Sequence, residues 1–269
     1  MTFLNLLLWF QNTYGTKHQN VFFELVFFLS KKAKTKLFFI ENKNNKIDFS
    51  KQKFDSLCDK YFNKKISLAH LTKQTLFCNL KFCIDKKVLA PREITEQMTN
   101  DFIRYIKKKS KIKVYDLCAG SGNIGISIKK HCPKHKIVCL DKYQYCISNI
   151  KRNCQLHKVK IKIIKGDVLK FLNKNKQLDY IISNPPYVDQ KNDKYIVNTA
   201  WESKNALFAK ENGLYYFRKY FTWLSKNKCK ECWLEYGLLQ KHRLIHLLKK
   251  YPKLKYRLVK NYLIIRKKI

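Results

Sequence analysis

From about residue 91 to the C-terminus, short apolar runs alternate with segments of helical periodicity. The runs have the length of buried strands, and the segments between them place apolar residues three and four positions apart. Strands that alternate with helices make right-handed crossovers and build a mostly parallel sheet with helices on both faces. The expected strands are 113–117, 136–140, 161–164, 178–183 and 232–235, and the expected helices are 124–130, 145–156, 213–225 and 240–250.

The C-terminal end breaks this alternation. Two apolar runs, 256–259 and 262–266, are separated only by Lys260 and Asn261. A two-residue connection suits an antiparallel hairpin, because a crossover between parallel strands needs a much longer segment. We therefore expect an α/β domain whose mostly parallel sheet ends in an antiparallel hairpin.

The first 90 residues have a different pattern. Apolar residues recur at helical spacing over 4–8 and 22–29, which predicts a small helical bundle. Short β-like runs at 75–80 and 81–84 then fit a hairpin. The expected division is a helical bundle over 1–67, a β-hairpin linker over 68–90 and the α/β domain over 91–269.

The charge of the chain is strongly basic, with a formal net charge of +38 from 57 Lys and Arg against 19 Asp and Glu. Such an excess favours a polyanionic partner such as nucleic acid. The cations are almost all lysines spread through every segment, and the chain is also rich in Asn, Ile, Phe and Tyr, as AT-rich codon usage produces. The net charge therefore does not distinguish between the possible functions.

Apolar length argues against a membrane protein. No stretch approaches the ~20 apolar residues that span a bilayer. The apolar start at 3–10 lacks a basic flank and a small-residue cleavage site, so it predicts a core helix rather than a signal peptide. We expect a cytoplasmic protein without a membrane partner.

The 10 cysteines show no repeated pairing. The single C-x-x-C, Cys229 to Cys232, has no second pair, whereas a structural zinc site normally needs four ligands. We interpret the cysteines as small buried hydrophobes in a reducing compartment and expect no metal.

A glycine-rich turn follows the first expected strand. Gly120 and Gly122 let the backbone approach a ligand without Cβ atoms in the way. The helix that begins after Gly122 offers free N–H groups to a carboxylate. A nucleotide-type ligand and a plain tight turn both fit this pattern alone.

Acidic residues stand at the carboxyl ends of three successive strands: Asp116, Asp141 and Asp167. Each alone fits a helix cap or a solvated turn. Together they favour an adenosine-containing cofactor, since an acid after the second strand can accept hydrogen bonds from a ribose diol. The pattern Asp-x-x-x-Gly-x-Gly followed by an acid resembles the class I S-adenosylmethionine methyltransferases, which implies a Rossmann-like domain.

The fourth strand runs into Asn184-Pro185-Pro186-Tyr187. Two prolines fix two φ angles and remove two backbone donors, which leaves a stiff turn with free carbonyls. We hypothesise that the Asn184 side-chain oxygen and the Pro185 carbonyl accept the two N–H bonds of a planar amide, while Tyr187 packs against it. The alternative is a strand terminator followed by a surface turn.

These residues resemble the HemK/PrmC-type release factor glutamine methyltransferases. The likeness includes the linker segments 67–72 and 88–96, and the downstream segments 201–208 and 212–214. It implies S-adenosylmethionine as cofactor and, as substrate, the glutamine of the Gly-Gly-Gln motif in class I peptide chain release factors. We expect a monomer, for which contact with nucleic acid is possible but not required.

The resemblance also assigns roles to residues. Asn184, Pro185, Pro186 and Tyr187 would bind the glutamine and carry catalysis. Cofactor contacts would come from Asp116, Cys118, Ala119, Gly120, Ser121, Gly122, Asp141, Asp167, Val168 and Asn184.

Three positions depart from the family's pattern. Cys118 replaces a frequent glycine, Val168 a frequent aromatic expected near the adenine, and Ser203 a proline. These departures concern cofactor affinity rather than reaction type. His70 fits a structural histidine better than a general base, and Arg92 and Glu96 either shape the cofactor site or cap the next helix.

Other functions share parts of this pattern. One alternative is methylation of a glutamine in a large-subunit ribosomal protein. The pair Thr95-Glu96 favours a release factor as substrate over this alternative. A second is amino-group methylation of a nucleic-acid base, which usually requires a target-recognition domain that is not visible here. A third is a degraded, non-catalytic binding protein, which the intact N-P-P-Y turn argues against.

Overall fold

The computed structural model describes residues 1–31, 35–189 and 199–268. These residues form two compact units. The first contains residues 1–73 and 199–201, and the second contains residues 74–189 and 202–268.

The first unit is helical, as the apolar spacing predicted. Thr2, Thr35 and Ser50 begin three of its helices, and each side-chain oxygen accepts a hydrogen bond from the backbone N–H three residues later. Aromatic rings fill the core, where Phe10 and Phe54 are fully buried. The role of residues 1–67 in substrate recognition and their boundary stay predictions. The helices are α1 (Phe3–Tyr14), α2 (Gln19–Leu29), α3 (Lys36–Glu41), α4 (Lys51–Phe62) and α5 (Leu68–Leu71), with a 3-10 turn, η1 (Thr16–His18), before α2.

The second unit begins with a hairpin of β1 (Gln74–Phe77) and β2 (Leu80–Cys83). A hairpin was predicted here, but its turn lies at Cys78 and Asn79 rather than after residue 80. Both turn residues have positive φ angles, 49° and 60°, which matches the twist of a two-residue antiparallel turn.

A seven-stranded sheet with the order β5-β4-β3-β6-β7-β9-β8 follows. Strands β5, β4, β3, β6 and β7 run parallel, and β9 pairs antiparallel with β7 and β8. The predicted α/β class with a C-terminal hairpin is confirmed, and every predicted strand overlaps an observed one. The strands are β3 (Lys113–Leu117), β4 (Lys136–Asp141), β5 (Lys162–Lys165), β6 (Gln177–Ser183), β7 (Lys228–Glu235), β8 (Leu254–Val259) and β9 (Tyr262–Lys267).

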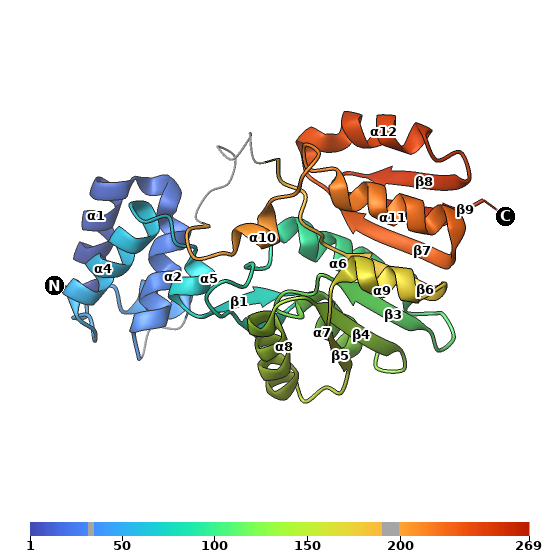
Figure 1. Ribbon diagram of the computed structural model, residues 1–269. Coiled ribbons are helices and arrows are strands. Elements are labelled where there is room, and N and C mark those ends of the chain that lie inside the picture. The colour runs from blue at the N-terminus through green and yellow to red at the C-terminus, as the bar shows by residue number, and fades with distance from the viewer. Residues whose placement is uncertain (32–34, 190–198, 269) are drawn as a thin grey trace. The chain divides into compact units, whose positions relative to one another are not determined.

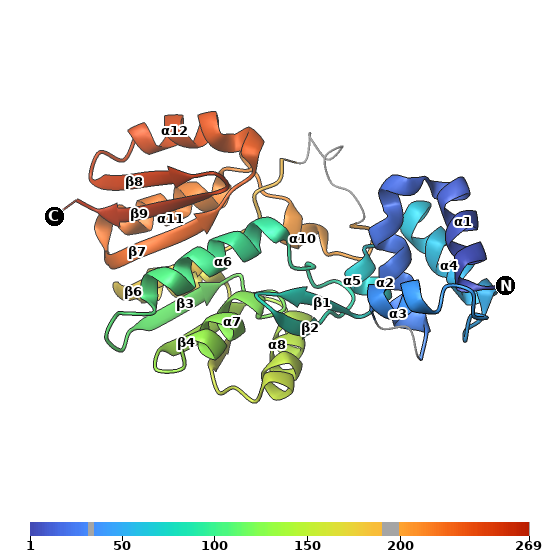
Figure 2. The same ribbon diagram turned by 180° about the vertical axis from the view of Figure 1, so that it is seen from behind.

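Helices cover both faces of this sheet (Figures 1 and 2). Helices α6, α7 and α8 pack on one face, while α9 and α11 cover the other and α12 lies beside α11. Of these, α7, α8, α11 and α12 were predicted, whereas α6, α9 and the short α10 were not. Their bounds are α6 (Glu93–Ile106), α7 (Asn123–His131), α8 (Gln144–His157), α9 (Val168–Lys174), α10 (Lys204–Leu207), α11 (Tyr215–Lys226) and α12 (Lys241–Lys249), and a 3-10 turn, η3 (Leu238–Gln240), precedes α12.

The strand order creates a switch point at the centre of the sheet. Strand β3 lies between β4 and β6. The chain therefore continues from β3 to β4 and β5 on one side of it, and then returns to place β6 on the other side. Ligands of open parallel sheets bind at such a point, beyond the carboxyl ends of the strands. Leu117 pairs with Ser183, and Cys118 and Asn184 therefore leave the sheet next to each other.

In the described part of the chain, no helix has the length and apolarity needed to cross a membrane. All 10 cysteines are free thiols. Within the same described residues, no three His, Cys, Asp or Glu side chains gather in a way that could hold a metal ion.

Candidate active site

The glycine loop after β3 has left-handed backbone at Cys118, Gly120 and Gly122, with φ angles of 63°, 54° and 78°. A Cβ on Gly122 would lie 3.1 Å from Ile126, whereas one on Gly120 would meet nothing within 4 Å. The loop is thus packed at Gly122 and open at Gly120. Cys118 adopts a conformation that costs a side-chain-bearing residue about 1–3 kcal/mol, at the position where the family often has glycine.

Asp141, at the end of β4, fixes this loop. Its Oδ2 accepts a hydrogen bond from the Gly120 N–H over 2.9 Å, and its Oδ1 accepts one from the Tyr143 N–H over 3.0 Å. Burial raises the pKa of its carboxyl group, and these two bonds oppose that rise. The carboxylate lines the cavity beyond the loop.

Asp116 lies beneath the loop rather than in the cavity. Its carboxyl is fully buried, and Oδ2 accepts a hydrogen bond from the Gly125 N–H in α7 over 2.9 Å. Burial raises its pKa to about 7. Neither Asp116 nor Gly122 is among the residues that line the cavity, so the geometry does not support their expected direct contact with a cofactor.

Asp167 caps α9. Its Oδ1 accepts hydrogen bonds from the backbone N–H groups of Leu169 and Lys170, and its Oδ2 lies 3.4 Å from the Lys142 ammonium group. Burial opposes ionisation, but the two N–H bonds and Lys142 leave the pKa below its ordinary value. Asp167 therefore caps the helix and also lines the cavity, so both interpretations of this residue apply.

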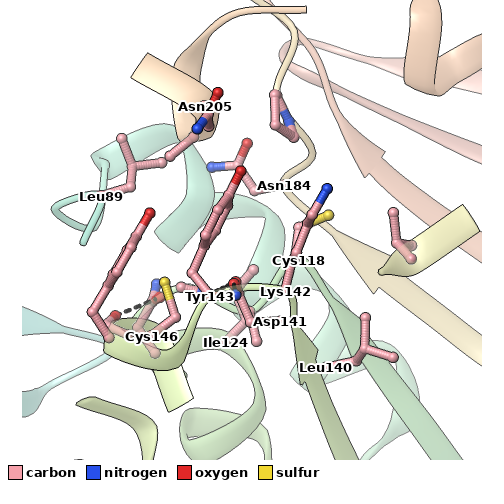
Figure 3. A pocket seen from close by; sticks show the side chains of 18 of the residues that line it. Leu89, Cys118, Ile124, Leu140, Asp141, Lys142, Tyr143, Cys146, Asn184 and Asn205 are labelled. Carbon is pink, nitrogen blue, oxygen red and sulfur yellow. Dashed lines mark hydrogen bonds between the residues drawn. The ribbon is translucent and has the colours of Figure 1, made fainter. Parts of the chain in front are cut away.

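A cavity opens beyond these strand ends, with about 860 Å³ of empty space including the solvent at its mouth (Figure 3). In Figure 3, Leu89, Asn184 and Asn205 lie on one side of the cavity and Asp141 and Cys146 on the other. Of the predicted cofactor residues, those that line it are Cys118, Ala119, Gly120, Ser121, Asp141, Asp167, Val168 and Asn184.

The cavity contains tyrosines, although Val168 occupies the position where the family often has an aromatic residue. Val168 is buried, with 5% of its surface exposed. Tyr143 and Tyr216 line the same cavity, and Tyr143 stacks on Tyr145 with ring centroids 5.2 Å apart. The Tyr145 hydroxyl hydrogen bonds to Ser203, the third position that departs from the family's pattern.

The turn after β6 carries a second, smaller cavity of about 280 Å³ of empty space. Asn184 lines both cavities, and Pro185, Tyr187 and Arg92 line the second one. The Asn184 side-chain Nδ2 donates a hydrogen bond to the Thr95 hydroxyl in α6 over 3.1 Å. This bond uses the side-chain nitrogen of Asn184, so the side-chain oxygen is the group of this residue that can accept a hydrogen bond from a ligand.

A buried acid lies behind this turn. The Tyr187 hydroxyl donates a hydrogen bond to Glu235 Oε1 over 2.9 Å, and Thr95 also hydrogen bonds to the Glu235 carboxyl. Glu235 is fully buried at the end of β7, and burial raises its pKa to about 7. Burial and the neighbouring Glu235 charge raise the pKa of Tyr187 well above its ordinary range.

The backbone of Tyr187 is held from outside the turn. Its carbonyl accepts a hydrogen bond from the Gln240 side chain, whose Oε1 in turn accepts one from the Gly237 N–H. Gly213 has a φ angle of 83°, and a Cβ there would collide with the Tyr187 carbonyl and with Gln240. Glycine is therefore the residue that fits at position 213.

Two residues that the sequence left open have structural partners. Arg92 Nη2 lies 2.6 Å from the buried Glu202 carboxylate, which also accepts the Ala90 N–H. Glu96 accepts a hydrogen bond from the Cys78 N–H and so fastens the hairpin. His70 is buried in the first unit with Nδ1 2.7 Å from the Ser67 hydroxyl, in agreement with a structural histidine.

Sequence reasoning placed the N-P-P-Y turn and the glycine loop but missed several residues of the site. Thr95 and Glu235 were not predicted as partners of the turn, and Tyr143 and Tyr216 were not predicted in the cavity. Glu235 had a usable signal, because it ends a predicted strand in the same way as Asp141. The tyrosines had none, since nothing in the pattern distinguishes them from other surface aromatics.

Comparison with known proteins agrees with this architecture. Residues 79–215 match the family model of the methyltransferase small domain. A Thermus thermophilus 16S rRNA methyltransferase in complex with AdoMet and guanosine shares the fold, with a TM-score of 0.50 and 12% identity over 73% of this chain and 50% of that one.

Relatives with higher sequence identity carry a more specific name. A release factor glutamine methyltransferase of Clostridium acetobutylicum is 32% identical over 73% of this chain and 70% of its own length. One of Buchnera aphidicola is 30% identical over 76% of both chains. A ribosomal protein uL3 glutamine methyltransferase of Francisella tularensis is 33% identical over 55% of this chain and 48% of its own length. The chain therefore belongs to the release factor glutamine methyltransferase family and carries the class I methyltransferase fold.

Proposed function

We propose that this protein transfers a methyl group from S-adenosylmethionine to the side-chain amide nitrogen of a glutamine, and that this glutamine lies in the Gly-Gly-Gln motif of class I peptide chain release factors. The observation that carries the proposal is the position of Asn184, which lines the cavity at the glycine loop and the smaller cavity at the N-P-P-Y turn. One residue can thus face a methyl donor and a methyl acceptor.

The larger cavity fits the donor that the fold and the family imply. The left-handed backbone at Gly120 leaves open space where a Cβ would stand, so the loop can approach a ligand closely. Asp141 uses both oxygens for backbone N–H groups, but a carboxylate has about four acceptor sites and can still accept from a ribose hydroxyl. Tyr143 and Tyr216 would offer ring surface to the adenine. Asp116 would support the loop from beneath.

The smaller cavity fits a glutamine side chain. The Asn184 side-chain oxygen and the Pro185 carbonyl would accept the two N–H bonds of the amide, and Tyr187 would form a wall beside it. The two prolines keep this turn stiff, so the amide would bind to groups that are already in position.

S-adenosylmethionine supplies a methyl group that is already activated on a sulfonium. The residues of the turn must then align the amide nitrogen with that group, a positioning effect that can contribute several kcal/mol. Hydrogen bonds from both amide N–H groups to Asn184 and Pro185 would set the nitrogen in place. As the nitrogen gains the methyl group, the bond from that group to sulfur breaks and leaves the thioether S-adenosylhomocysteine. One of the two amide protons passes to solvent water.

A ribosomal protein is the second candidate substrate. It is favoured by the relative in Francisella tularensis, whose name refers to ribosomal protein uL3. The release factor remains the first candidate because relatives of that name match longer parts of this chain.

The test is a parallel incubation of the full-length protein with labelled S-adenosylmethionine. The acceptors are a class I release factor, the same factor with Ala in place of the glutamine of its Gly-Gly-Gln motif, ribosomes, and DNA. We expect label on the unaltered release factor alone. Label on a ribosomal protein would support the second candidate, and label on nucleic acid or on the altered factor would refute the proposed chemistry.

A further inference from the structure

Glu235 is a buried acid for which the proposed chemistry has no use. It ends β7, is fully buried, and has one oxygen, Oε2, without a hydrogen-bond partner among the described residues. Arg92, the cation whose charge acts on Glu235, is engaged by Glu202 over 2.6 Å. Burying a carboxyl group without its own cation is costly, so a neutral side chain would stabilise this position better.

The partners of Glu235 both belong to the proposed active site, since Tyr187 lines the smaller cavity and Thr95 lines the larger one. The Tyr187 hydroxyl donates to its Oε1 over 2.9 Å, and the Thr95 hydroxyl hydrogen bonds to the same carboxyl group. Thr95 also contacts Asn184, whose Nδ2 lies 3.1 Å from the Thr95 oxygen. A continuous chain of hydrogen bonds therefore runs from the buried acid to the amide that would hold the glutamine.

The chemistry of these groups gives the chain a direction. An ionised carboxylate only accepts hydrogen bonds, so the Thr95 hydroxyl must give its single proton to Glu235. Thr95 can then only accept from its other neighbour, and that neighbour must present Nδ2. The two ends of the Asn184 amide have nearly the same shape, but only the oxygen can accept an N–H bond from a substrate.

We propose that Glu235 is a positioning residue that, through Thr95, holds the Asn184 side chain with its oxygen towards the acceptor amide and, directly, holds the Tyr187 hydroxyl. This inference rests on the proposed role of Asn184 in binding the glutamine. It explains why an acid is kept at a buried position that lies outside both cavities.

The device depends on the charge of Glu235. When the carboxyl is protonated it can donate a hydrogen bond as well, and the direction of the Thr95 hydroxyl is no longer fixed. The groups that face it are Thr95 from α6, Tyr187 from the N-P-P-Y turn and the Arg92 guanidinium, with Glu202 behind Arg92. Burial raises the pKa of Glu235 to about 7, so the change falls near neutral pH.

The first test needs no methyl transfer. The side-chain amide signal of Asn184, assigned by its loss in Asn184→Ala, is followed by nuclear magnetic resonance from pH 5.5 to pH 8.5 on the full chain. We expect an inflection near pH 7 in the wild type and in Thr95→Ser, and no inflection in Glu235→Gln or Thr95→Val. A wild-type Asn184 signal whose chemical shift does not change with pH, or an inflection that is still present in Glu235→Gln, would overturn the proposal.

The second test uses kinetics with the release factor. Glu235→Gln and Thr95→Val should each lower kcat by about tenfold at pH 8, the effect of one misdirected hydrogen bond in the site, with little change in affinity for S-adenosylhomocysteine. The double variant should be no slower than either single variant, because both act through Asn184. Thr95→Ser should recover most of the loss.

Glu231→Gln is the matched control, since Glu231 lies on the same strand and contacts Trp233 instead of the site. Multiplied losses in the double variant, or the same loss in the control, would contradict a positioning role. If the wild type transfers no methyl group to a release factor, the proposed function fails, and the resonance measurement still decides the role of Glu235.

Discussion

Asn184 donates a hydrogen bond from its side-chain nitrogen to the hydroxyl of Thr95, a residue 89 positions earlier in the chain, over 3.1 Å. The bond joins the turn after β6 to α6. It uses the side-chain nitrogen of a residue that lines both cavities, and leaves the side-chain oxygen to accept a hydrogen bond. The central residue of the proposed site is thus oriented before any ligand binds.

Replacing Asn184 tests its role as acceptor of the substrate amide. In Asn184→Ala we expect methyl transfer to a release factor to fall by about 100-fold, since a preorganised group at the reacting centre is lost. Binding of S-adenosylhomocysteine, measured by calorimetry, should change much less. Transfer at the wild-type rate with normal cofactor binding would refute this role.

Cys118 offers a test of backbone strain in the cofactor loop. Its φ angle of 63° suits glycine, tolerates an unbranched side chain and opposes a β-branched one. We expect Cys118→Val to lower the free energy of unfolding by about 2 kcal/mol in urea denaturation, and Cys118→Gly to change it by less than about 1 kcal/mol. Equal losses in the two variants would mean that packing rather than φ decides this position.

Gly213→Ala should disturb the N-P-P-Y turn from outside the site. The added Cβ would collide with the Tyr187 carbonyl and Gln240, so we expect an unfolding free energy lower by about 3 kcal/mol and a raised KM for the release factor. Gly15→Ala is the control, because its φ of 87° also opposes a side chain while its Cβ would meet nothing within 4 Å. A comparable loss in the control would show that strain alone explains the effect.

The pKa of Glu235 predicts a pH dependence of stability. Its ordinary value of 4.5 rises to about 7 on folding, so between these values the folded state holds more protons than the unfolded state. The contribution of this group to the free energy of unfolding is therefore largest below pH 4.5. It falls as the pH rises to about 7 and no longer changes above that pH. Relative to the wild type, Glu235→Gln should gain about 3 kcal/mol between pH 4.5 and pH 8 in urea denaturation.

The same measurement on Glu231→Gln isolates the effect. Asp116, whose pKa also rises to about 7, contributes equally to all three proteins and drops out of the comparison. A difference between wild type and Glu235→Gln that stays constant with pH would contradict the raised pKa.

Tyr216 tests which aromatic residue compensates for Val168. We expect Tyr216→Ala to weaken binding of S-adenosylhomocysteine by about tenfold, in line with the 1–3 kcal/mol that stacking on a base contributes, and Tyr216→Phe to retain it. Calorimetry without any protein substrate provides the measurement. Unchanged affinity in Tyr216→Ala would remove this ring from the proposed adenine contact.

Much of the fold could be predicted because the signals were local. The parallel strands of the sheet appear as apolar runs. The two runs at the C-terminus are separated only by Lys260 and Asn261, a connection that allowed only a hairpin. Helix α6 was missed although Met98, Phe102 and Ile106 recur every four residues, because polar residues interrupt the run. Helix α9 is only seven residues long and begins at a cap, Asp167, that also fits a plain turn.

The site was harder to predict because its members come from distant segments. The N-P-P-Y turn and the glycine loop are contiguous motifs and could be found. Thr95 and Glu235 are joined to Asn184 only by the packing of α6 against β7, which no spacing in the sequence encodes. Asp116 was expected in the cavity, but its carboxyl turns under the loop to meet Gly125.

The most direct measurement maps the methyl group. A class I release factor is incubated with S-adenosylmethionine and either the wild-type protein or Asn184→Ala, digested, and analysed by tandem mass spectrometry. We expect one added methyl group on the glutamine of the Gly-Gly-Gln motif with the wild type and almost none with the variant. A methyl group on any other residue, or a release factor that stays unmodified after incubation with the wild-type protein and S-adenosylmethionine, would contradict the account.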